Sequence, residues 1–462
     1  MSVVAGPADV AGLRAEVMGL VLERGDPGWD LEVAGFNAAI THRPALVVTA
    51  ATPDDVAAAV RYAAAAGLPV AVQATGHGAH APIDNGLLIN TRRLDAVIID
   101  PVARTAIVQA GTRWRQVIDA AAPLGLAPLT GSASGVGAVG YTLGGGLPVM
   151  GRTFGFAADH VRSLDVVTAD GQLRTVDART EPDLFWGLRG GGGNLGIVTA
   201  MVIDLMSVTT VHGGGIFYAA EHLPAVLHAW CTWASSLPES VTTSVAILRP
   251  PPAPEIPEPL RGQVVAHLRF CHVGKATDPV ALLAPMRNAA PVLIDTVGEI
   301  PYTAIDAVHQ DPEHPVPFCH RGLLMDRLTA DTVDALIAVA GPDVVAPLVM
   351  CEIRQLGGAL RQAPAEGNAV SGRAASYSLV AVGLLTPEAA ALAFHAVDAV
   401  LAAADSAATG HTMVNLHGAP GDDVDRARAW EPATYQRLLD LVRLYDPDGL
   451  FRFGHAVGRR TT

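Results

Sequence analysis

The sequence is poor in the residues on which several protein classes depend. It has four cysteines with no CxxC pair and a single lysine, Lys275, so it offers neither a metal-ligand spacing of cysteines nor a P-loop with its Gly-Lys-Ser/Thr ending. Only 16% of the residues are charged, and the net charge is −14 without a basic cluster, so nucleic acid is not an expected partner. No apolar run is long enough and free enough of charge to span a membrane.

The remaining composition is that of a large globular protein. The chain has 462 residues, half of them apolar, which is too long for one simple core and predicts two domains. Residues 8–24 are expected to form an amphipathic helix, and the N-terminal region lacks the apolar core of a secretion signal. The four widely spaced cysteines are interpreted as reduced thiols. Together these features predict a cytoplasmic protein.

The most unusual segment is the glycine-rich stretch Leu129–Gly155. Seven of its first eighteen residues are glycine, separated mostly by small or apolar side chains. Glycine at this density costs conformational entropy on folding, so it is expected where the backbone must approach another group closely. We therefore predict that this stretch lies against the diphosphate and ring of a large cofactor.

Two shorter glycine clusters lie beside predicted strands. The first, Ala74–His80, follows a β-α-β pattern over residues 45–72 and could point backbone N–H groups at an anion, with a plain turn as the alternative. The second, Arg189–Gly196, leads into a strand and not into a helix, so the helix dipole of a Rossmann fingerprint is missing. We therefore exclude a nicotinamide site at the second cluster.

The ordered motifs of the chain resemble those of a known family. They are ALVVTAATPDDVAAAV, TGHGAH, GSASGVGAVGYTLGGG, GFAADHVRSLDVVTADG and DLFWGLRGGGGNLGIVT, followed near the C-terminus by YQRL and YDPDGLFR. This set resembles the vanillyl-alcohol-oxidase (PCMH-type) superfamily of FAD-linked oxidoreductases, in particular its berberine-bridge-enzyme-like members. The resemblance implies an α+β fold with an FAD-binding domain in two parts, residues 1–205 and 411–462. It also implies an inserted substrate domain, residues 206–410, with an antiparallel sheet covered by helices.

The resemblance implies covalent FAD. His77 matches the position that bonds the 8α-methyl carbon of the flavin, and a neutral imidazole nitrogen is a competent nucleophile near pH 7. His80 is a weaker alternative. Many members of the family add a bond from a cysteine to flavin C6, but the matching residue here is Ala133. A single link, a less oxidising flavin and a more open site are therefore expected.

The remaining cofactor contacts implied by the resemblance are mostly backbone, and no metal site is expected. In chain order the predicted contacts are Thr75, Gly76, His77, Gly78, Gly131, Ser132, Ser134, Gly135, Gly137, Ala138, Gly140, Tyr141, Leu143, Gly144, Gly193, Gly196, Val198 and Asn415. Ala138 occupies the place where the family admits or excludes oxygen, and its small side chain is compatible with oxidase activity.

The reaction also needs a base, and the candidates are Tyr141, Glu352, Tyr377 and Tyr435, with Gln355 as a hydrogen-bonding partner only. Tyr141 ranks first because it lies in the glycine-rich stretch itself. Each phenol would need a neighbour that lowers its pKa. In the predicted strand VMCEIRQLGGA, Glu352 and Arg354 share one face, and a solvated ion pair is the alternative to a role in the site.

The sequence therefore predicts an FAD-dependent oxidase that moves a hydride from an alcohol or amine carbon to flavin N5, with reoxidation by O2. The expected substrate is a small molecule or natural product of secondary metabolism, although no motif names it. The alternatives are a dehydrogenase, an oxidative cyclase or an oxygenase of the same fold with another acceptor, or a flavin-binding protein without turnover. A monomer or homodimer is expected.

Overall fold

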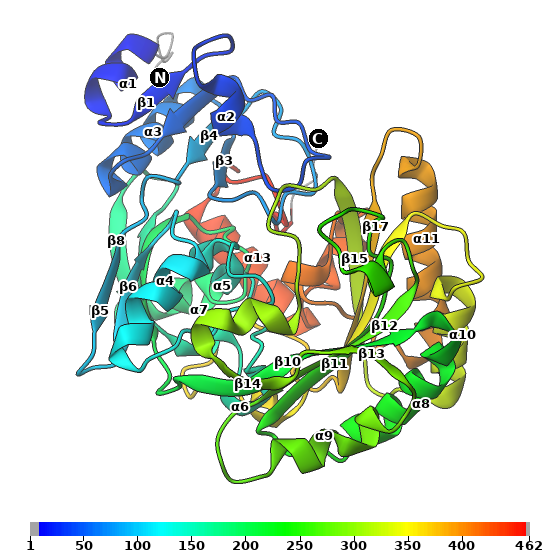
Figure 1. Ribbon diagram of the computed structural model, residues 1–462. Helices are drawn as coiled ribbons and strands as arrows, with labels where there is room; N and C mark the ends of the chain where they lie inside the picture. Colours follow the sequence, from blue (N-terminus) through cyan, green and yellow to red (C-terminus); the bar gives the residue numbers. More distant parts are fainter. Residues whose placement is uncertain (1–8, 459–462) are drawn as a thin grey trace.

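The computed structural model describes residues 9–458, and these residues form three β-sheets (Figure 1). The first sheet has the order β1-β2-β4-β3 and consists of β1 (Leu20–Leu22), β2 (Leu46–Thr49), β3 (Val70–Gln73) and β4 (Leu87–Asn90). The second has the order β5-β6-β9-β7-β8 and consists of β5 (Val97–Asp100), β6 (Thr105–Gln109), β7 (Val161–Val167), β8 (Leu173–Asp177) and β9 (Ile197–Asp204).

The third sheet has eight strands and is antiparallel throughout. Its order is β13-β10-β12-β11-β16-β17-β15, with β14 also paired to β10. The strands are β10 (Thr210–Ala219), β11 (Val241–Leu248), β12 (Val265–His272), β13 (Val292–Asp295), β14 (Gly298–Pro301), β15 (Phe318–Met325), β16 (Leu348–Gln355) and β17 (Tyr377–Leu384).

The helices pack around these sheets. Those before the third sheet are α1 (Val10–Glu16), α2 (Trp29–Val33), α3 (Pro53–Ala66), α4 (Trp114–Ala121), α5 (Ala138–Leu143), α6 (Gly151–Phe154) and α7 (Pro182–Leu188). Those within and after it are α8 (Leu223–Ala234), α9 (Pro279–Arg287), α10 (Ala330–Ala340), α11 (Ala390–Ala403), α12 (Asp423–Ala427) and α13 (Pro432–Tyr445). No helix in residues 9–458 combines the length and the apolarity that a membrane crossing requires.

Helix α3 is the connection that delivers the chain to the loop of His77. Thr52 and Asp55 form a reciprocal capping box at its start, Pro53 occupies the first turn, and Gly67 ends it with a φ of 66°. The helix returns the chain to β3, which runs parallel to β4, as β2 does. His77 follows four residues after β3 ends at Gln73.

The predicted helix over residues 8–24 is shorter than expected. Within the described residues α1 ends at Glu16, and residues 20–22 form β1, antiparallel to β2; residue 8 lies outside the described residues. The buried carboxylate of Asp55 accepts hydrogen bonds from the N–H groups of Met18 and Gly19, at 2.9 and 3.0 Å. These bonds hold the chain extended where the amphipathic pattern alone indicates a helix.

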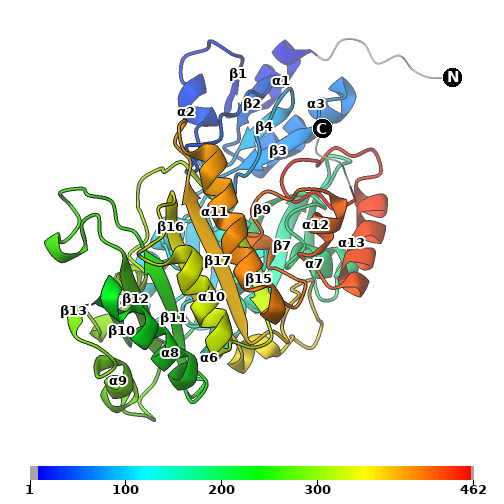
Figure 2. The same ribbon diagram turned by 90° about the vertical axis from the view of Figure 1, so that its right-hand side faces the viewer.

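The C-terminal segment packs beside the N-terminal sheets. Leu438 and Leu441 of α13 share a core cluster with Leu184 and Phe185 of α7, and Figure 2 shows α13 next to α7. The Val70 N–H at the start of β3 donates to Leu450 O at 2.8 Å. The division at residues 205 and 410 stays a prediction.

The two faces of the third sheet differ in chemistry. One face contributes Val245, Leu268, Ile353 and Leu379 to a large apolar core, and α8, α10 and α11 lie across it (Figure 2). Because side chains alternate along a strand, the neighbouring residues of β11, β12 and β16 point to the opposite face. That face carries polar and charged side chains. The mixed helix and sheet architecture agrees with the predicted α+β class.

Candidate cofactor and active site

A cavity of about 630 Å³ lies between the loop after β3, helix α5 and the C-terminal segment. This volume falls within the roughly 300–1,000 Å³ typical of small-molecule and cofactor sites. Most of the predicted cofactor contacts line it, namely Thr75, Gly76, His77, Gly78, Gly131, Ser132, Gly137, Gly140, Tyr141, Leu143, Gly144, Gly193, Gly196, Val198 and Asn415.

Three predicted contacts do not line the cavity. The Ser134 N–H and hydroxyl both donate to the Asp306 carboxylate, and its neighbour Gly135 lies at the same outer turn. Ala138 is fully buried in the core between the second sheet and α13. The side chain of Ala138 is therefore turned away from the cavity, and its small size carries no argument about oxygen access in this structure.

His77 lies on the cavity wall in a fixed orientation. A hydrogen bond of 2.9 Å joins its Nδ1 to Thr75 Oγ1, and its ring stacks on Phe36 with centroids 3.7 Å apart. The preceding Gly76 has a φ of 74°, and a β-carbon there would lie 2.6 Å from Gly35 Cα. Burial, reinforced by the charge of Arg113, lowers the pKa of His77 to about 4. The imidazole is therefore neutral at pH 7.

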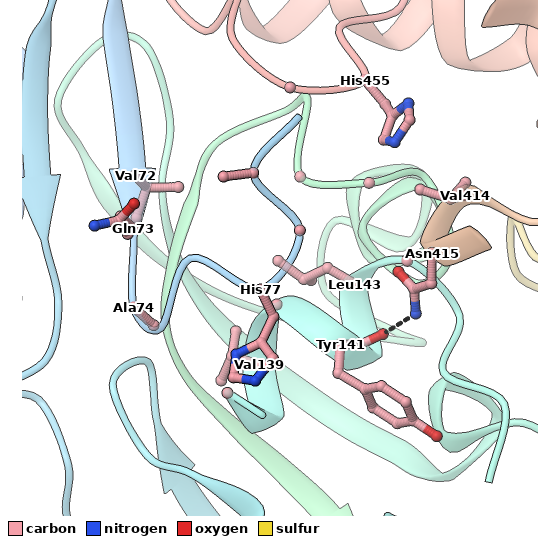
Figure 3. A pocket seen from close by; sticks show the side chains of 18 of the residues that line it. Val72, Gln73, Ala74, His77, Val139, Tyr141, Leu143, Val414, Asn415 and His455 are labelled. Carbon is pink, nitrogen blue, oxygen red and sulfur yellow. Dashed lines mark hydrogen bonds between the residues drawn. The ribbon is translucent and has the colours of Figure 1, made fainter. Parts of the chain in front are cut away.

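Helix α5 forms the opposite wall and presents glycine backbone. Asn415 Nδ2 donates to Tyr141 O at 2.9 Å, the bond drawn in Figure 3. At Gly144 a β-carbon would lie 1.8 Å from Asn415 Oδ1, so only glycine allows this approach. Figure 3 shows His77, Leu143, Asn415 and His455 around one space, although they come from distant parts of the chain.

The residues of the cavity fit FAD. A β-carbon added at Gly78 or Gly140 would meet no atom within 4 Å, so bare backbone faces the open space. Four buried polar atoms on the wall have no hydrogen-bond partner: His42 Nε2, His80 Nε2, Tyr141 Oη and His455 Nδ1. Buried polar groups are normally paired, so these atoms fit a polar ligand. A dinucleotide cofactor has polar groups that unpaired polar atoms can bind, and its size requires the close approach that bare backbone allows.

A histidine cluster that the sequence did not reveal forms the far end of the cavity. His80, His320 and His455 line it, and His417 stacks on His455 with centroids 5.4 Å apart. Burial and the neighbouring histidines lower the pKa of His320 to about 4, and burial holds the pKa of His455 well below its usual value. His80, whose pKa burial also lowers, His320 and His455 are therefore neutral at pH 7. No group of His, Cys, Asp and Glu within residues 9–458 has a metal-binding arrangement.

Glu352 is fully buried on the polar face of the third sheet, so the alternative of a solvated ion pair is wrong. Its Oε1 accepts from Ser244 Oγ at 2.7 Å and from Arg269, and its Oε2 accepts from Arg354 Nε at 2.8 Å. Burial alone would raise the pKa of Glu352, but the two guanidiniums outweigh it and hold the pKa well below its usual range. Both oxygens are engaged, so this carboxylate is poorly placed to act as a base.

The structure places three other candidates away from the cavity. Tyr377 and Gln355 point to the helix-covered side of the third sheet, where Tyr377 packs near Trp230 and Gln355 Nε2 donates to Ala234 O of α8. Tyr435 lies on α13, and its hydroxyl accepts from the Gly458 N–H at 3.3 Å. Strand alternation alone puts Gln355 on the opposite face from Glu352 and Arg354, but it does not tell which face the helices cover.

Tyr141 alone of the five catalytic candidates lines the cavity. Its ring is held between Gly131 and Gly146, where β-carbons would lie 2.8 and 2.5 Å from ring atoms. Burial raises the pKa of Tyr141 well above its usual value, and the nearby charge of Arg354 opposes this only in part. The phenol is therefore protonated at neutral pH and can donate a hydrogen bond.

Comparison with known proteins agrees with this site. The family described as FAD binding domain matches residues 44–177. FAD-linked oxidoreductase OXR2 of Pyricularia oryzae is 30% identical over 312 residues, covering 65% of this chain and 59% of that protein. The chain spans about half to two-thirds of the length of the curated relatives it matches.

Solved structures share the fold over nearly the whole chain. 6-Hydroxy-D-nicotine oxidase from Arthrobacter nicotinovorans has a TM-score of 0.82 at 22% identity, covering 98% of this chain and 99% of that one. BBE-like 1 from Physcomitrella patens has a TM-score of 0.84 at 18% identity, covering 98% and 100%. Glucooligosaccharide oxidase from Acremonium strictum, described with a 6-S-cysteinyl, 8α-N1-histidyl FAD, has a TM-score of 0.83 at 19% identity, covering 97% and 98%.

The matched domain and the glycine-lined cavity define an FAD-binding protein. The chain is similar in sequence to FAD-linked oxidoreductases and shares its fold with solved oxidase and BBE-like structures, in agreement with the resemblance carried by the order of its motifs.

The histidine cluster predicts an acid-sensitive site. Because the pKa of His320 is lowered to about 4, the unfolded chain binds a proton between pH 6.5 and 4 that the folded chain does not, and stability falls as the pH falls. We expect His320→Gln to reduce the loss of unfolding free energy between pH 7 and pH 5 by up to about 2 kcal/mol, measured by urea denaturation. The control is His395→Gln, at an exposed position on α11, and its unfolding free energy should fall between pH 7 and pH 5 by as much as that of the wild type. An unchanged loss in His320→Gln would contradict this assignment.

Proposed function

We propose that the protein is an FAD-dependent oxidase that removes a hydride from an alcohol or amine carbon of a small molecule. The observation that carries the proposal is the neutral His77 facing a cavity walled by the bare backbone of α5. FAD, when bound, supplies the acceptor for two electrons. The chain would supply its backbone at residues 75–78 and at Gly131, Ser132 and Gly137, and Asn415 fixes the position of α5. The division into residues 1–205, 206–410 and 411–462 and a cytoplasmic location belong to the same proposal.

We infer that FAD is held by one covalent bond, through His77. A hydrogen bond joins Nδ1 of His77 to the Thr75 hydroxyl, and the imidazole is neutral and stacked in place, which supports formation of a bond from the ring to the 8α carbon. The C–H bond broken there would give up a proton and leave two electrons on the flavin, which O2 would remove. Glucooligosaccharide oxidase carries a second, cysteinyl link, whereas position 133 here is alanine. All four cysteines are free thiols, and none of them lines the cavity.

The single link predicts how flavin behaves when the protein is denatured. We expect flavin to stay with the wild-type chain after unfolding in acid or urea and ultrafiltration, and to pass entirely into the filtrate with His77→Ala. His80→Ala is the matched control from the same loop, and it should retain the covalent flavin. Release of flavin from the unfolded wild type would disprove the covalent bond. Release of flavin from His80→Ala but not from His77→Ala would show that His80 carries the bond instead.

Tyr141 is the residue that we assign to the substrate's oxygen or nitrogen. Its buried, unpaired hydroxyl lines the cavity and is protonated, so it can donate a hydrogen bond that orients the reacting group. Glu352 acts at a distance from the cavity by holding Arg354 through its Nε. The hydride would carry two electrons and one proton from the substrate carbon to FAD, and the proton of the substrate O–H or N–H would pass to solvent water, so that the substrate loses two electrons and two protons.

The tyrosines distinguish this assignment from the other candidates. We expect Tyr141→Phe to slow anaerobic flavin reduction about 100-fold with any substrate that reduces the wild type, because one preorganised donor is lost. Tyr377→Phe and Tyr435→Phe lie outside the cavity and should stay within about twofold of the wild type. The assignment fails if Tyr141→Phe reduces the flavin as fast as those two variants.

The electron acceptor is tested separately. As an oxidase, the protein passes two electrons and two protons to O2, and we expect one H2O2 for each substrate molecule oxidised in air, measured by a peroxidase-coupled assay. The alternative is a dehydrogenase, a cyclase or an oxygenase of the same fold with another acceptor. Rapid flavin reduction without peroxide in air would favour that alternative. A flavin that no candidate substrate bleaches anaerobically would indicate a binding protein without turnover.

A further inference from the structure

Arg354 presents a free edge of its guanidinium to the cavity. Nε is bonded to Glu352 Oε2 at 2.8 Å, which fixes the plane of the group. Neither Nη1 nor Nη2 donates a hydrogen bond to another described residue, and the side chain is only 16% exposed. Arg354 lines both the large cavity and a smaller adjoining pocket that reaches His309. Two guanidinium donors therefore point into enclosed space without a protein acceptor.

The polar face of the third sheet carries an excess of positive charge. Arg269 and Arg354 share one carboxylate, that of Glu352, and all three groups are buried or nearly so. The pKa of His309, beside Glu352, is held well below its usual value by burial and by the two arginines, so it adds no charge. The charge of Asp311 helps to raise the pKa of Arg354, but the two side chains form no ion pair. A buried charge without a counter-ion is costly, so an anion at this place is stabilised.

Further unpaired polar atoms lie in the same row of the sheet. Arg269, Ser244, Arg354 and Ser378 are cross-strand neighbours on β12, β11, β16 and β17. Ser378 Oγ is buried without a hydrogen-bond partner. His309 Nδ1, on the loop after the 3-10 helix Tyr302–Val308, is also unpaired. In the same cavity, Tyr141 adds a third unpaired group, its phenol, which Figure 3 shows pointing away from Asn415 and His455.

We propose that Arg354 binds a carboxylate of the substrate, so that the compound oxidised is a small carboxylic acid such as a hydroxy acid or an N-substituted amino acid. The proposal rests on the oxidase function above and specifies its substrate class. A planar guanidinium with two free amino groups matches the two oxygens of a carboxylate. The carboxylate would also neutralise the excess charge of the arginine pair. Tyr141, which lines the same cavity, then meets the hydroxyl or amine of the same molecule.

The role of Arg354 can be separated from the stability of the fold. If Arg354 is replaced, Glu352 keeps its bonds from Arg269 and Ser244, so the buried carboxylate is still paired. Replacing Arg269 would instead remove the fully buried partner of the same carboxylate. Arg354→Gln is therefore the informative change, and Arg354→Lys retains the charge while losing the planar fork.

The experiment titrates the flavin-loaded protein with benzoate and with its neutral analogue benzamide, and it follows the flavin absorbance. We expect benzoate to perturb the spectrum with saturation and benzamide to bind much more weakly. Arg354→Gln should weaken benzoate binding about 30-fold or more, leaving benzamide unchanged, and Arg354→Lys should fall in between. Arg327→Gln removes an arginine whose side chain is 58% exposed, and it should bind benzoate like the wild type.

The outcomes separate this proposal from the oxidase function. A purified protein without flavin refutes the proposed function before any titration begins. A flavin spectrum that does not respond to benzoate, or that responds equally to benzamide, overturns the carboxylate site alone. Unchanged benzoate affinity in both Arg354→Gln and Arg354→Lys also overturns the carboxylate site. Inorganic phosphate that displaces benzoate at equal concentration would overturn the choice of a carboxylate as the anion.

Discussion

The close approach of the C-terminal segment to one glycine-rich backbone is the contact on which the site depends. A β-carbon at Gly144 would overlap Asn415, and one at Gly146 would lie 2.5 Å from the ring of Tyr141. Asn415 in turn donates to the carbonyl of Tyr141, so the same few atoms fix the helix, the phenol and the returning chain. A side chain at either glycine would separate these segments and open the wall of the cavity. The glycine density is therefore a packing requirement as well as a cofactor requirement.

His77 and Glu352 are both buried, but burial leaves His77 neutral while Glu352 stays charged. At His77 no acid among residues 9–458 stabilises the imidazolium, so desolvation keeps the ring neutral and nucleophilic. At Glu352 two guanidiniums overcome desolvation, so the carboxylate stays ionised in a fully buried position. The first environment suits attachment of a flavin. The second holds Arg354 rigidly while leaving its outer edge unpaired.

The cofactor half of the site could be predicted from the sequence, because its function depends on the backbone. Two local features are visible directly in the sequence: the glycines Gly140 and Gly144, and the histidine between Gly76 and Gly78. The substrate half could not be predicted in this way. Whether Tyr377 faces the cavity or the helices depends on which side of β17 is covered, and α8, α10 and α11 decide that from distant positions. His320 and His455 meet only because the C-terminal segment folds back.

The same difference explains why the FAD-binding domain is recognisable and the substrate is not. Backbone contacts constrain residues to glycine over long stretches, so cofactor binding leaves a pattern that persists at low identity. Substrate recognition as proposed for Arg354 rests on single side chains of an antiparallel sheet, each of which can change without disturbing the hydrogen bonds between the strands. Arg354 is such a position, since its backbone pairs with Ser244 and Ser378 whatever its side chain is. Substrate class in this fold is therefore best read from the charge of the buried sheet face, one residue at a time.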